Sequence, residues 1–165
     1  MNKICLVAAL LFINGFVFAE TRVLFSPNGN IGKEIITDIN HCSKTLDIMV
    51  FSLTSESITK SILDAAARGV KIRIIADSFQ NKDKPTKIEY LNSHGIKIKM
   101  MKGREQGIMH NKVAIFDGVA IFTGSYNWTE NSEHYNHENA LFTDDPQAVK
   151  PYIHQFEKLW SSDEN

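Results

Sequence analysis

The feature that most constrains the fold of this chain is a regular alternation of two hydrophobic patterns in its first hundred residues. Short apolar runs typical of strands alternate with segments whose apolar residues recur at helical spacing. The expected strands cover residues 23–25, 46–53, 71–76 and 96–101, and the expected helices cover residues 31–40, 56–68 and 88–93. Helical crossovers join parallel strands, so this order predicts a largely parallel sheet covered by helices.

The second half of the chain has a pattern that is typical of antiparallel pairing. Residues 112–116 and 119–123 are strand-like, and Asp117-Gly118 between them is a strong signal for a two-residue hairpin. A strand over residues 138–142 and a helix opening at Pro146 complete the chain, and residues 81–85 are expected to be a polar loop. We therefore expect one α/β domain with a mixed, mostly parallel β-sheet flanked by helices.

The first nineteen residues resemble a secretory signal peptide. Residues 1–3 are a short basic start, residues 4–18 are almost wholly apolar, and Ala19 before Glu20 fits a small-residue cleavage site. The apolar run is short for a span of about 20 residues. We expect cleavage after Ala19, a mature domain over residues 20–165 and a periplasmic or secreted protein, with an uncleaved membrane anchor as the alternative.

The net charge of −1 hides an uneven distribution along the chain. Residues 71–112 carry ten Lys and Arg against four Asp and Glu, whereas residues 113–165 carry two bases and nine acids. The basic part leads directly into His110 and Lys112, which favours an anionic substrate. We expect Lys71, Arg73 and the bases within residues 82–104 to form a track for a polyanion.

His110 and Lys112 lie two residues apart on an expected strand and therefore on the same side of it. An imidazole beside an ammonium is favourable when an anion such as phosphate lies between them. Lys112 would bind the phosphate charge, and an unprotonated His110 could attack phosphorus. Ser125 and Asn127, after the second hairpin strand, could add donors. Taken alone, however, the same residues also fit a hairpin turn and a strand end.

The combined motif resembles the HKD signature of the phospholipase D superfamily. It consists of His110-x-Lys112, four residues, Asp117, and then Gly124-Ser125 and Asn127. The likeness extends from about Val23 to Trp160 and is strongest to the single-motif branch typified by exported bacterial endonucleases.

The resemblance implies a role for each matching residue. His110 would be the nucleophile and form a phosphohistidine, while Lys112 and Asn127 would bind phosphate oxygens. Glu138 would accept a hydrogen bond from the His110 ring and fix its tautomer, and Ser125 would support the same site. The resemblance implies no metal and no cofactor.

Two features of the signature need a separate interpretation. Asp117 belongs to the catalytic motif, but its position at the hairpin turn favours a mainly structural role. The mechanism implied by the resemblance needs two histidines, one that attacks and one that protonates the leaving oxygen, and this chain carries one motif. A homodimer with two-fold symmetry would supply the second His110.

Other residues near the motif suggest alternatives. His134, His137 and Glu138 could suggest a metal cluster, but their order differs from the helical His-Glu-x-x-His pattern, and a loop is expected there. Tyr126 and Trp128 could stack on nucleobases of a single strand, or they could belong to the core or to a dimer interface, and the core is favoured for at least one of them.

The motif implies phosphodiester chemistry but does not by itself distinguish a nucleic acid substrate from a phospholipid substrate. The basic middle part favours a nonspecific nuclease acting on DNA, with RNA left open. A phospholipase D acting on a membrane phospholipid such as cardiolipin is the first alternative. A non-catalytic protein that captures DNA is the second, and the complete set of motif residues argues against it.

Overall fold

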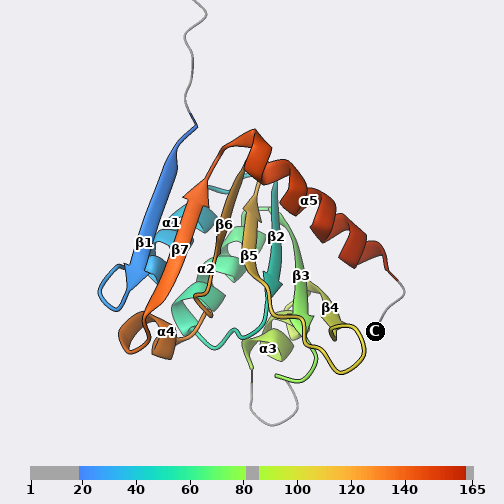
Figure 1. Cartoon of the computed structure of the whole chain (residues 1–165). Coiled ribbons are helices and arrows are strands. Elements are labelled where there is room, and N and C mark those ends of the chain that lie inside the picture. Colours follow the sequence, from blue (N-terminus) through green and yellow to red (C-terminus); the bar gives the residue numbers. More distant parts are fainter. Residues whose placement is uncertain (1–18, 81–85, 163–165) are drawn as a thin grey trace, which may run out of the picture.

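Residues 19–80 and 86–162, the parts of the chain that the computed structural model describes, form seven strands and five helices. In chain order these are β1 (Thr21–Ser26), α1 (Ile31–His41), β2 (Thr45–Val50), α2 (Glu56–Ala67), β3 (Lys71–Asp77), α3 (Lys87–Ser93), β4 (Lys97–Met101), β5 (Lys112–Phe116), β6 (Ala120–Gly124), α4 (Glu130–His134), β7 (Glu138–Thr143) and α5 (Pro146–Ser161). All strands belong to one sheet in the order β1-β7-β6-β5-β2-β3-β4 (Figure 1).

The sheet is mixed and flanked by helices, as predicted, but it is not mostly parallel. β2 pairs in parallel with β3, and β3 with β4, whereas the four other neighbouring pairs are antiparallel. The hydrophobic pattern identified each strand but did not reveal its neighbours. β1 lies at the far edge beside β7, because the three C-terminal strands are inserted between β1 and β2.

Two hydrophobic clusters hold the layers together, one on each face of the sheet. Helices α1 and α2 cover one face with fully buried side chains such as Ile35 and Ile62, and α5 covers part of the other face with Val149 and Phe156 (Figure 1). The helical spacing of apolar residues produces these buried faces.

Helix α5 is fixed to the sheet by two basic side chains that the sequence pattern assigned to a polyanion track. Arg73 is 2.7 Å from Asp47 and 2.6 Å from Glu157, and its guanidinium lies 4.7 Å from the centre of the Phe156 ring. Lys99 donates to backbone carbonyls at the end of α5, at 2.8 Å in the case of Leu159. Both residues therefore have structural roles.

The sequence pattern missed one helix. Residues 130–134 were expected to be part of a polar loop but form α4, where the Thr129 hydroxyl accepts a hydrogen bond from the backbone N–H of Ser132 at 3.2 Å. This is N-cap geometry, and it stabilises a helix too short to show apolar periodicity.

Three predictions concern segments outside the described residues: the signal peptide, the membrane anchor at residues 1–18 and the loop over residues 81–85. Within residues 19–80 and 86–162, no helix has the length and apolar character needed to span a membrane.

Candidate functional site

The predicted site residues, Asp117 excepted, meet at one end of the strands, because β5, β6 and β7 pair in antiparallel fashion. Lys112 opens β5 and Glu138 opens β7, while Ser125 directly follows the end of β6. Since β6 runs opposite to both neighbours, its end lies beside their beginnings (Figure 1). His110 and Asn127 flank these strand ends.

His110 and Lys112 are in contact through the backbone and share an aromatic neighbour. The Lys112 ammonium donates to the carbonyl oxygen of His110 at 2.9 Å and lies 4.9 Å from the centre of the Phe51 ring. The His110 ring packs edge-on to the same phenyl ring, with centroids 4.5 Å apart. Lys112 is only 5% exposed, so its charge is held in a partly desolvated position.

The electrostatics of this pair favour a neutral imidazole. Partial burial and the nearby Lys112 charge lower the pKa of His110 below its usual 6.5, although Asp77 opposes this shift. Burial also lowers the pKa of Lys112, and the Glu138 charge opposes that shift. An unprotonated His110 has a free nitrogen lone pair, which a nucleophile requires.

Glu138 is held by neighbours other than His110. One carboxylate oxygen accepts from the Ser125 hydroxyl at 2.5 Å, and the other accepts from the Asn136 amide at 2.9 Å. Its backbone N–H donates to the Ser26 hydroxyl at 3.2 Å. The expected hydrogen bond between Glu138 and the His110 ring is not formed among the described residues of one chain, where the carboxylate accepts from Ser125 and Asn136 instead.

Gly124 allows the contact between Ser125 and Glu138. A β-carbon at position 124 would lie 2.2 Å from the carbonyl oxygen of Asn139, so any other residue would push the end of β6 away from β7. Steric hindrance thus explains why the motif has glycine before Ser125.

Asn127 is positioned by its neighbour Trp128, which is fully buried. The backbone of Trp128 donates to Ser52 at 3.1 Å and accepts from Thr54 at 3.0 Å, which ties this segment to the connection after β2. The Asn127 side-chain oxygen is buried without a hydrogen-bond partner among the described residues. Because this oxygen is an acceptor, the Asn127 side-chain NH2 group is the part that can donate to a phosphate oxygen.

The alternative role of the two aromatic residues in base stacking is wrong. Tyr126 is 1% exposed and Trp128 is 0% exposed, and both pack against Phe122 in the core. The Tyr126 hydroxyl donates to Glu133 at 2.8 Å, which satisfies its one buried polar group.

Asp117 lies at the opposite end of β5 from Lys112. Its carboxylate accepts from the backbone N–H groups of Ser43, Lys44 and Thr45, at distances between 2.7 and 2.9 Å. Burial alone would raise the pKa of Asp117, but these hydrogen bonds lower it to about 2. The residue joins the hairpin turn to the start of β2, and this contact supports a structural role rather than a catalytic one.

Asp77 was missed by the sequence analysis. It is 0% exposed, and its carboxylate accepts from the backbone N–H of Met109 at 2.9 Å and of Phe79 at the same distance. It therefore positions the segment that leads into His110. The available signal was an acidic residue at the end of an apolar strand, which is costly to bury unless it is hydrogen-bonded.

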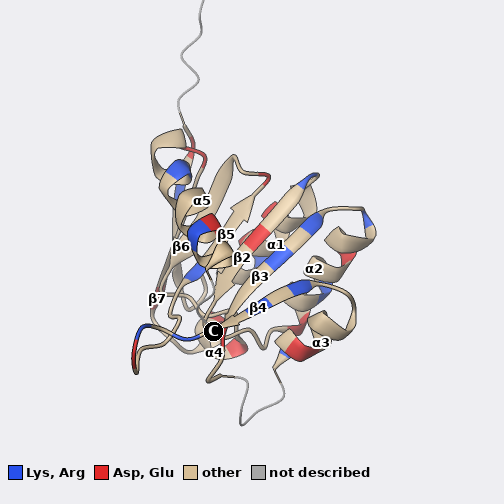
Figure 2. Ribbon diagram, turned by 90° about the vertical axis from the view of Figure 1, so that its right-hand side faces the viewer, with Lys and Arg blue, Asp and Glu red and all other residues tan. Residues whose placement is uncertain are grey.

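Among the described residues, the bases expected in the polyanion track do not form a continuous surface. A blue segment of β3 lies beside a red segment of β2 in Figure 2, in agreement with the pairing of Arg73 with Asp47 described above. Lys87 pairs with Glu56 at 2.6 Å. Lys71 and Lys97 open β3 and β4, at the opposite end of the sheet from His110.

Exposed bases remain on the loop that precedes His110. Lys102 and Arg104 are exposed, and the Lys102 ammonium lies 6.0 Å from the centre of the Phe79 ring. Residues 82 and 84, which also belonged to the expected track, lie outside the described residues.

Metal ligation by the histidines near Glu138 has no support among the described residues, where no group of three or more suitable side chains could hold an ion. His134 is instead 3.3 Å from Glu130, one helical turn earlier on α4.

Comparisons with known proteins identify the class of protein that this fold and site define. The family model described as "Cardiolipin synthase, PLD-like domain" matches residues 35–160. NucT from Helicobacter pylori superposes with a TM-score of 0.81 at 28% identity, over 88% of this chain and 98% of NucT. Nuc from Salmonella typhimurium, a phospholipase D family member, gives a TM-score of 0.79 at 27% identity, over 87% and 95% of the two chains.

A curated relative is the mitochondrial cardiolipin hydrolase of Xenopus tropicalis, which is 36% identical over 117 residues. The match covers 71% of this chain and 55% of that protein, so the chain spans about half the length of this relative. The chain belongs to the phospholipase D superfamily of phosphodiesterases and carries one PLD-like domain. The resemblance inferred from the HKD motif is thereby confirmed.

Proposed function

We propose that this protein is a metal-independent phosphodiesterase in which His110 attacks phosphorus. The observation that carries the proposal is the contact between His110, whose pKa is lowered, and the buried ammonium of Lys112. Lys112 and Asn127 bind the phosphate oxygens, and the Lys112 ammonium offsets the phosphate charge without a metal ion. This arrangement concentrates electrostatic stabilisation where negative charge develops in the transition state.

The reaction proceeds in two displacements. A ring nitrogen of His110 forms a bond to phosphorus as the bond from phosphorus to the leaving oxygen breaks, and a second histidine gives that oxygen a proton. Water then attacks the phosphohistidine, the phosphorus–nitrogen bond breaks, and the second histidine accepts the proton that the water loses.

The second histidine comes from a second copy of the chain. An apolar patch suited to dimerisation, formed by Val23, Phe25 and Tyr135, is exposed close to the site. These side chains are 52%, 64% and 77% exposed. Phe25 is paired with Asn139 across β1 and β7, one residue along the strands from the pair Ser26–Glu138, so the patch lies close to the backbone of Glu138. A two-fold contact there would bring two copies of the motif together.

We favour a nonspecific endonuclease that acts on DNA, with RNA as a further substrate to be tested. Lys102 and Arg104 are exposed on the loop before His110, and Phe79 beside Lys102 is 41% exposed. Basic side chains beside an aromatic ring suit single-stranded nucleic acid, because its phosphates bind cationic side chains and its nucleobases stack on aromatic rings. The near-complete overlap with NucT and Nuc supports the same conclusion.

A phospholipase D activity on cardiolipin is the second candidate. It is favoured by the similarity to a cardiolipin hydrolase and by the exposed apolar side chains of Phe79 and Ile108 near the site. A non-catalytic DNA-binding role is disfavoured, because binding alone does not require a desolvated lysine beside an unprotonated histidine. We also propose export to the periplasm or the medium after cleavage following Ala19.

One experiment tests these alternatives. The chain from Glu20 to Asn165 is incubated with plasmid DNA and with cardiolipin vesicles in excess EDTA. His110→Ala is the test variant, and His154→Ala, on the exposed side of α5, is the matched control. We expect the wild type and His154→Ala to cleave DNA, and His110→Ala to cleave none. Cleavage of lipid alone would replace the nuclease assignment, and full activity of His110→Ala would refute the nucleophile.

A further inference from the structure

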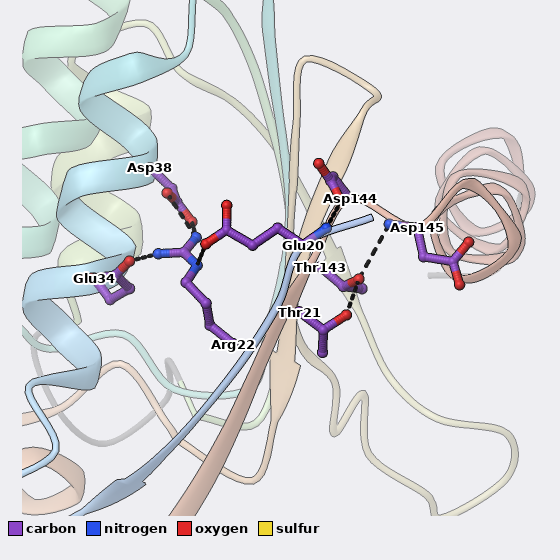
Figure 3. Close-up of polar contacts among 8 residues, drawn as sticks. All are labelled: Glu20, Thr21, Arg22, Glu34, Asp38, Thr143, Asp144 and Asp145. Carbon is purple, nitrogen blue, oxygen red and sulfur yellow. Dashed lines mark hydrogen bonds and ion pairs between the residues drawn. The ribbon is translucent and has the colours of Figure 1, made fainter. Parts of the chain in front are cut away.

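The backbone nitrogen of Glu20 is bound by a carboxylate at the end of the sheet away from the site. It donates to an Asp144 carboxylate oxygen at 2.6 Å, and the Asp144 backbone N–H donates back to the Glu20 carbonyl at 3.3 Å. This reciprocal contact continues the β1–β7 register by one pair beyond Thr21 and Thr143, whose hydroxyls are 2.8 Å apart (Figure 3).

The surroundings of Glu20 contain more negative than positive charge. Arg22 contacts the Glu20 carboxylate at 3.6 Å, Asp38 at 3.1 Å and also Glu34 (Figure 3). Three carboxylates therefore contact one guanidinium, and the Asp144 carboxylate lies at the backbone nitrogen of Glu20. Asp145 does not face this group, because it accepts from the backbone N–H of Gln147 as the N-cap of α5.

We propose that Ala19–Glu20 is a processing site whose product, the α-ammonium of Glu20, is bound by Asp144. Hydrolysis breaks the peptide bond by adding the elements of water: Ala19 gains a carboxylate, and the Glu20 nitrogen gains hydrogen and becomes an ammonium at neutral pH. A neutral hydrogen bond is thus converted into an ion pair, in a place where the surrounding charge is negative. The inference rests on the proposed export of the chain and not on its phosphodiesterase activity.

The ion pair would hold the first strand of the mature protein. Terminal residues are poorly ordered unless they are tied down, and β1 is an edge strand. The other end of β1 carries Ser26, whose hydroxyl accepts from Glu138 and donates to the Asn136 carbonyl at 2.9 Å. Cleavage would therefore stabilise the strand that supports the catalytic carboxylate.

The sign of the pH dependence follows from the contact. Asp144 raises the pKa of the Glu20 α-amino group above its unfolded value of about 7.7–8.0. The stabilisation is fully present below that unfolded pKa and is lost as the pH rises through the folded pKa. Other charged or titratable groups facing this region are the Glu20 side chain and, around the adjoining cavity, Arg22, Asp38, His41, Cys42 and Asp117. Burial raises the pKa of the Cys42 thiol to about 12, above the range of the measurement. Measurements between pH 7.5 and 10 avoid the range in which carboxylates and histidines ordinarily titrate.

The test compares two forms of the protein from Glu20 onward, one with a free α-amino group and one extended by an uncleaved Gly-Ser-Ala segment. Each form is prepared as wild type and as Asp144→Asn. At pH 7.5 we expect the free wild-type form to melt about 1–3 °C higher than the extended wild-type form. At pH 10 the two wild-type forms should melt at the same temperature. The free and extended forms of Asp144→Asn should melt at the same temperature at both pH values. The ¹⁵N-labelled Glu20 amine should titrate above 8 in the wild type.

Equal melting temperatures at pH 7.5, or an amine that titrates at or below its unfolded value, would overturn the ion pair. The intact mass of the exported protein tests the processing site separately, because a mass beginning at another residue would overturn cleavage at Ala19–Glu20 alone. Plasmid cleavage by both forms shows independently whether the proposed nuclease function holds.

Discussion

At the scale of single residues, the site depends on a small number of charged groups whose surroundings differ sharply. Lys112 and His110 share the Phe51 ring, and each has its pKa lowered by partial burial. Glu138 is held by two donors, Ser125 and Asn136. The arrangement favours a neutral imidazole at His110 and holds the Glu138 side chain in place, which suits nucleophilic attack on a phosphodiester.

Removing the Lys112 charge should raise the pKa of His110. In Lys112→Met the methylenes are retained and the ammonium is lost, so the repulsion that opposes imidazolium formation disappears. An NMR titration of the His110 ring should give a midpoint below 6.5 in the wild type and a higher midpoint in the variant. Lys158→Met, on an exposed part of α5, is the matched control and should leave the midpoint unchanged. An unchanged midpoint in Lys112→Met would contradict the assigned electrostatics.

At the scale of secondary structure elements, the signature contains residues that hold elements together as well as residues that face the substrate. Asp117 joins the β5–β6 turn to the start of β2 by accepting three backbone N–H groups. Gly124 lets the end of β6 approach β7. A sequence motif records both kinds of residue without distinguishing them.

Replacing Asp117 should therefore affect stability more than chemistry. Asp117→Ala leaves three N–H groups without their acceptor, and after allowance for solvent at this partly exposed turn we expect a loss of about 1–2 kcal/mol. The pKa of Asp117 is lowered from 3.8 to about 2, so its contribution is present above pH 4 and lost as the pH falls toward 2.

Urea unfolding at pH 7 and pH 3 measures this difference between the wild type and Asp117→Ala. The gap between the two proteins should narrow at pH 3, while activity per folded molecule at pH 7 stays near the wild-type value. A variant of full stability that has lost turnover would instead assign Asp117 to the chemistry.

At the scale of the whole molecule, the domain presents an apolar patch on one edge of the sheet and isolated basic residues on a loop near the other. The apolar patch adjoins Glu138 through β1 and β7, whereas Lys102 and Arg104 precede His110. The first surface suits a second copy of the chain, and the second suits a polyanion.

Disrupting the apolar patch should separate the subunits and abolish activity together. Phe25→Glu places a charge on an exposed side chain, so the isolated domain should remain folded by circular dichroism. We expect a monomer by light scattering with turnover reduced at least 100-fold, because the second histidine is absent. Val119→Glu, equally exposed but at the opposite end of the sheet, is the control and should remain dimeric. A monomeric Phe25→Glu variant with normal turnover would show that one chain suffices.

The basic residues near the site should determine affinity for a polymer. Lys102→Gln with Arg104→Gln should raise KM for single-stranded DNA several-fold, leave turnover of a small phosphodiester unchanged and reduce the salt dependence of DNA cleavage. Lys71→Gln with Lys97→Gln removes the same charge at the opposite end of the sheet and should change KM little. If the two double variants raise KM by the same factor, the net charge of the protein and not the position of these side chains controls DNA binding.

Some features of this protein were determined by sequence alone. Strand and helix positions followed from hydrophobic period and from turn residues such as Asp117-Gly118, because these signals act over a few neighbouring residues. The motif of His110, Lys112 and Asn127 likewise lies within eighteen residues, and its resemblance to the HKD signature indicated phosphodiester chemistry.

Only the tertiary structure decided which distant residues meet. Ser26 reaches Glu138, 112 residues away, because β1 lies beside β7, and this pairing is one of the four antiparallel pairs that outnumber the two parallel ones. The pairing of Arg73 with Glu157, 84 residues apart, removes an expected substrate contact. Such contacts depend on the order of the strands in the sheet and on which of several oppositely charged or polar side chains lies nearest. The local hydrophobic period of the sequence contains neither kind of information.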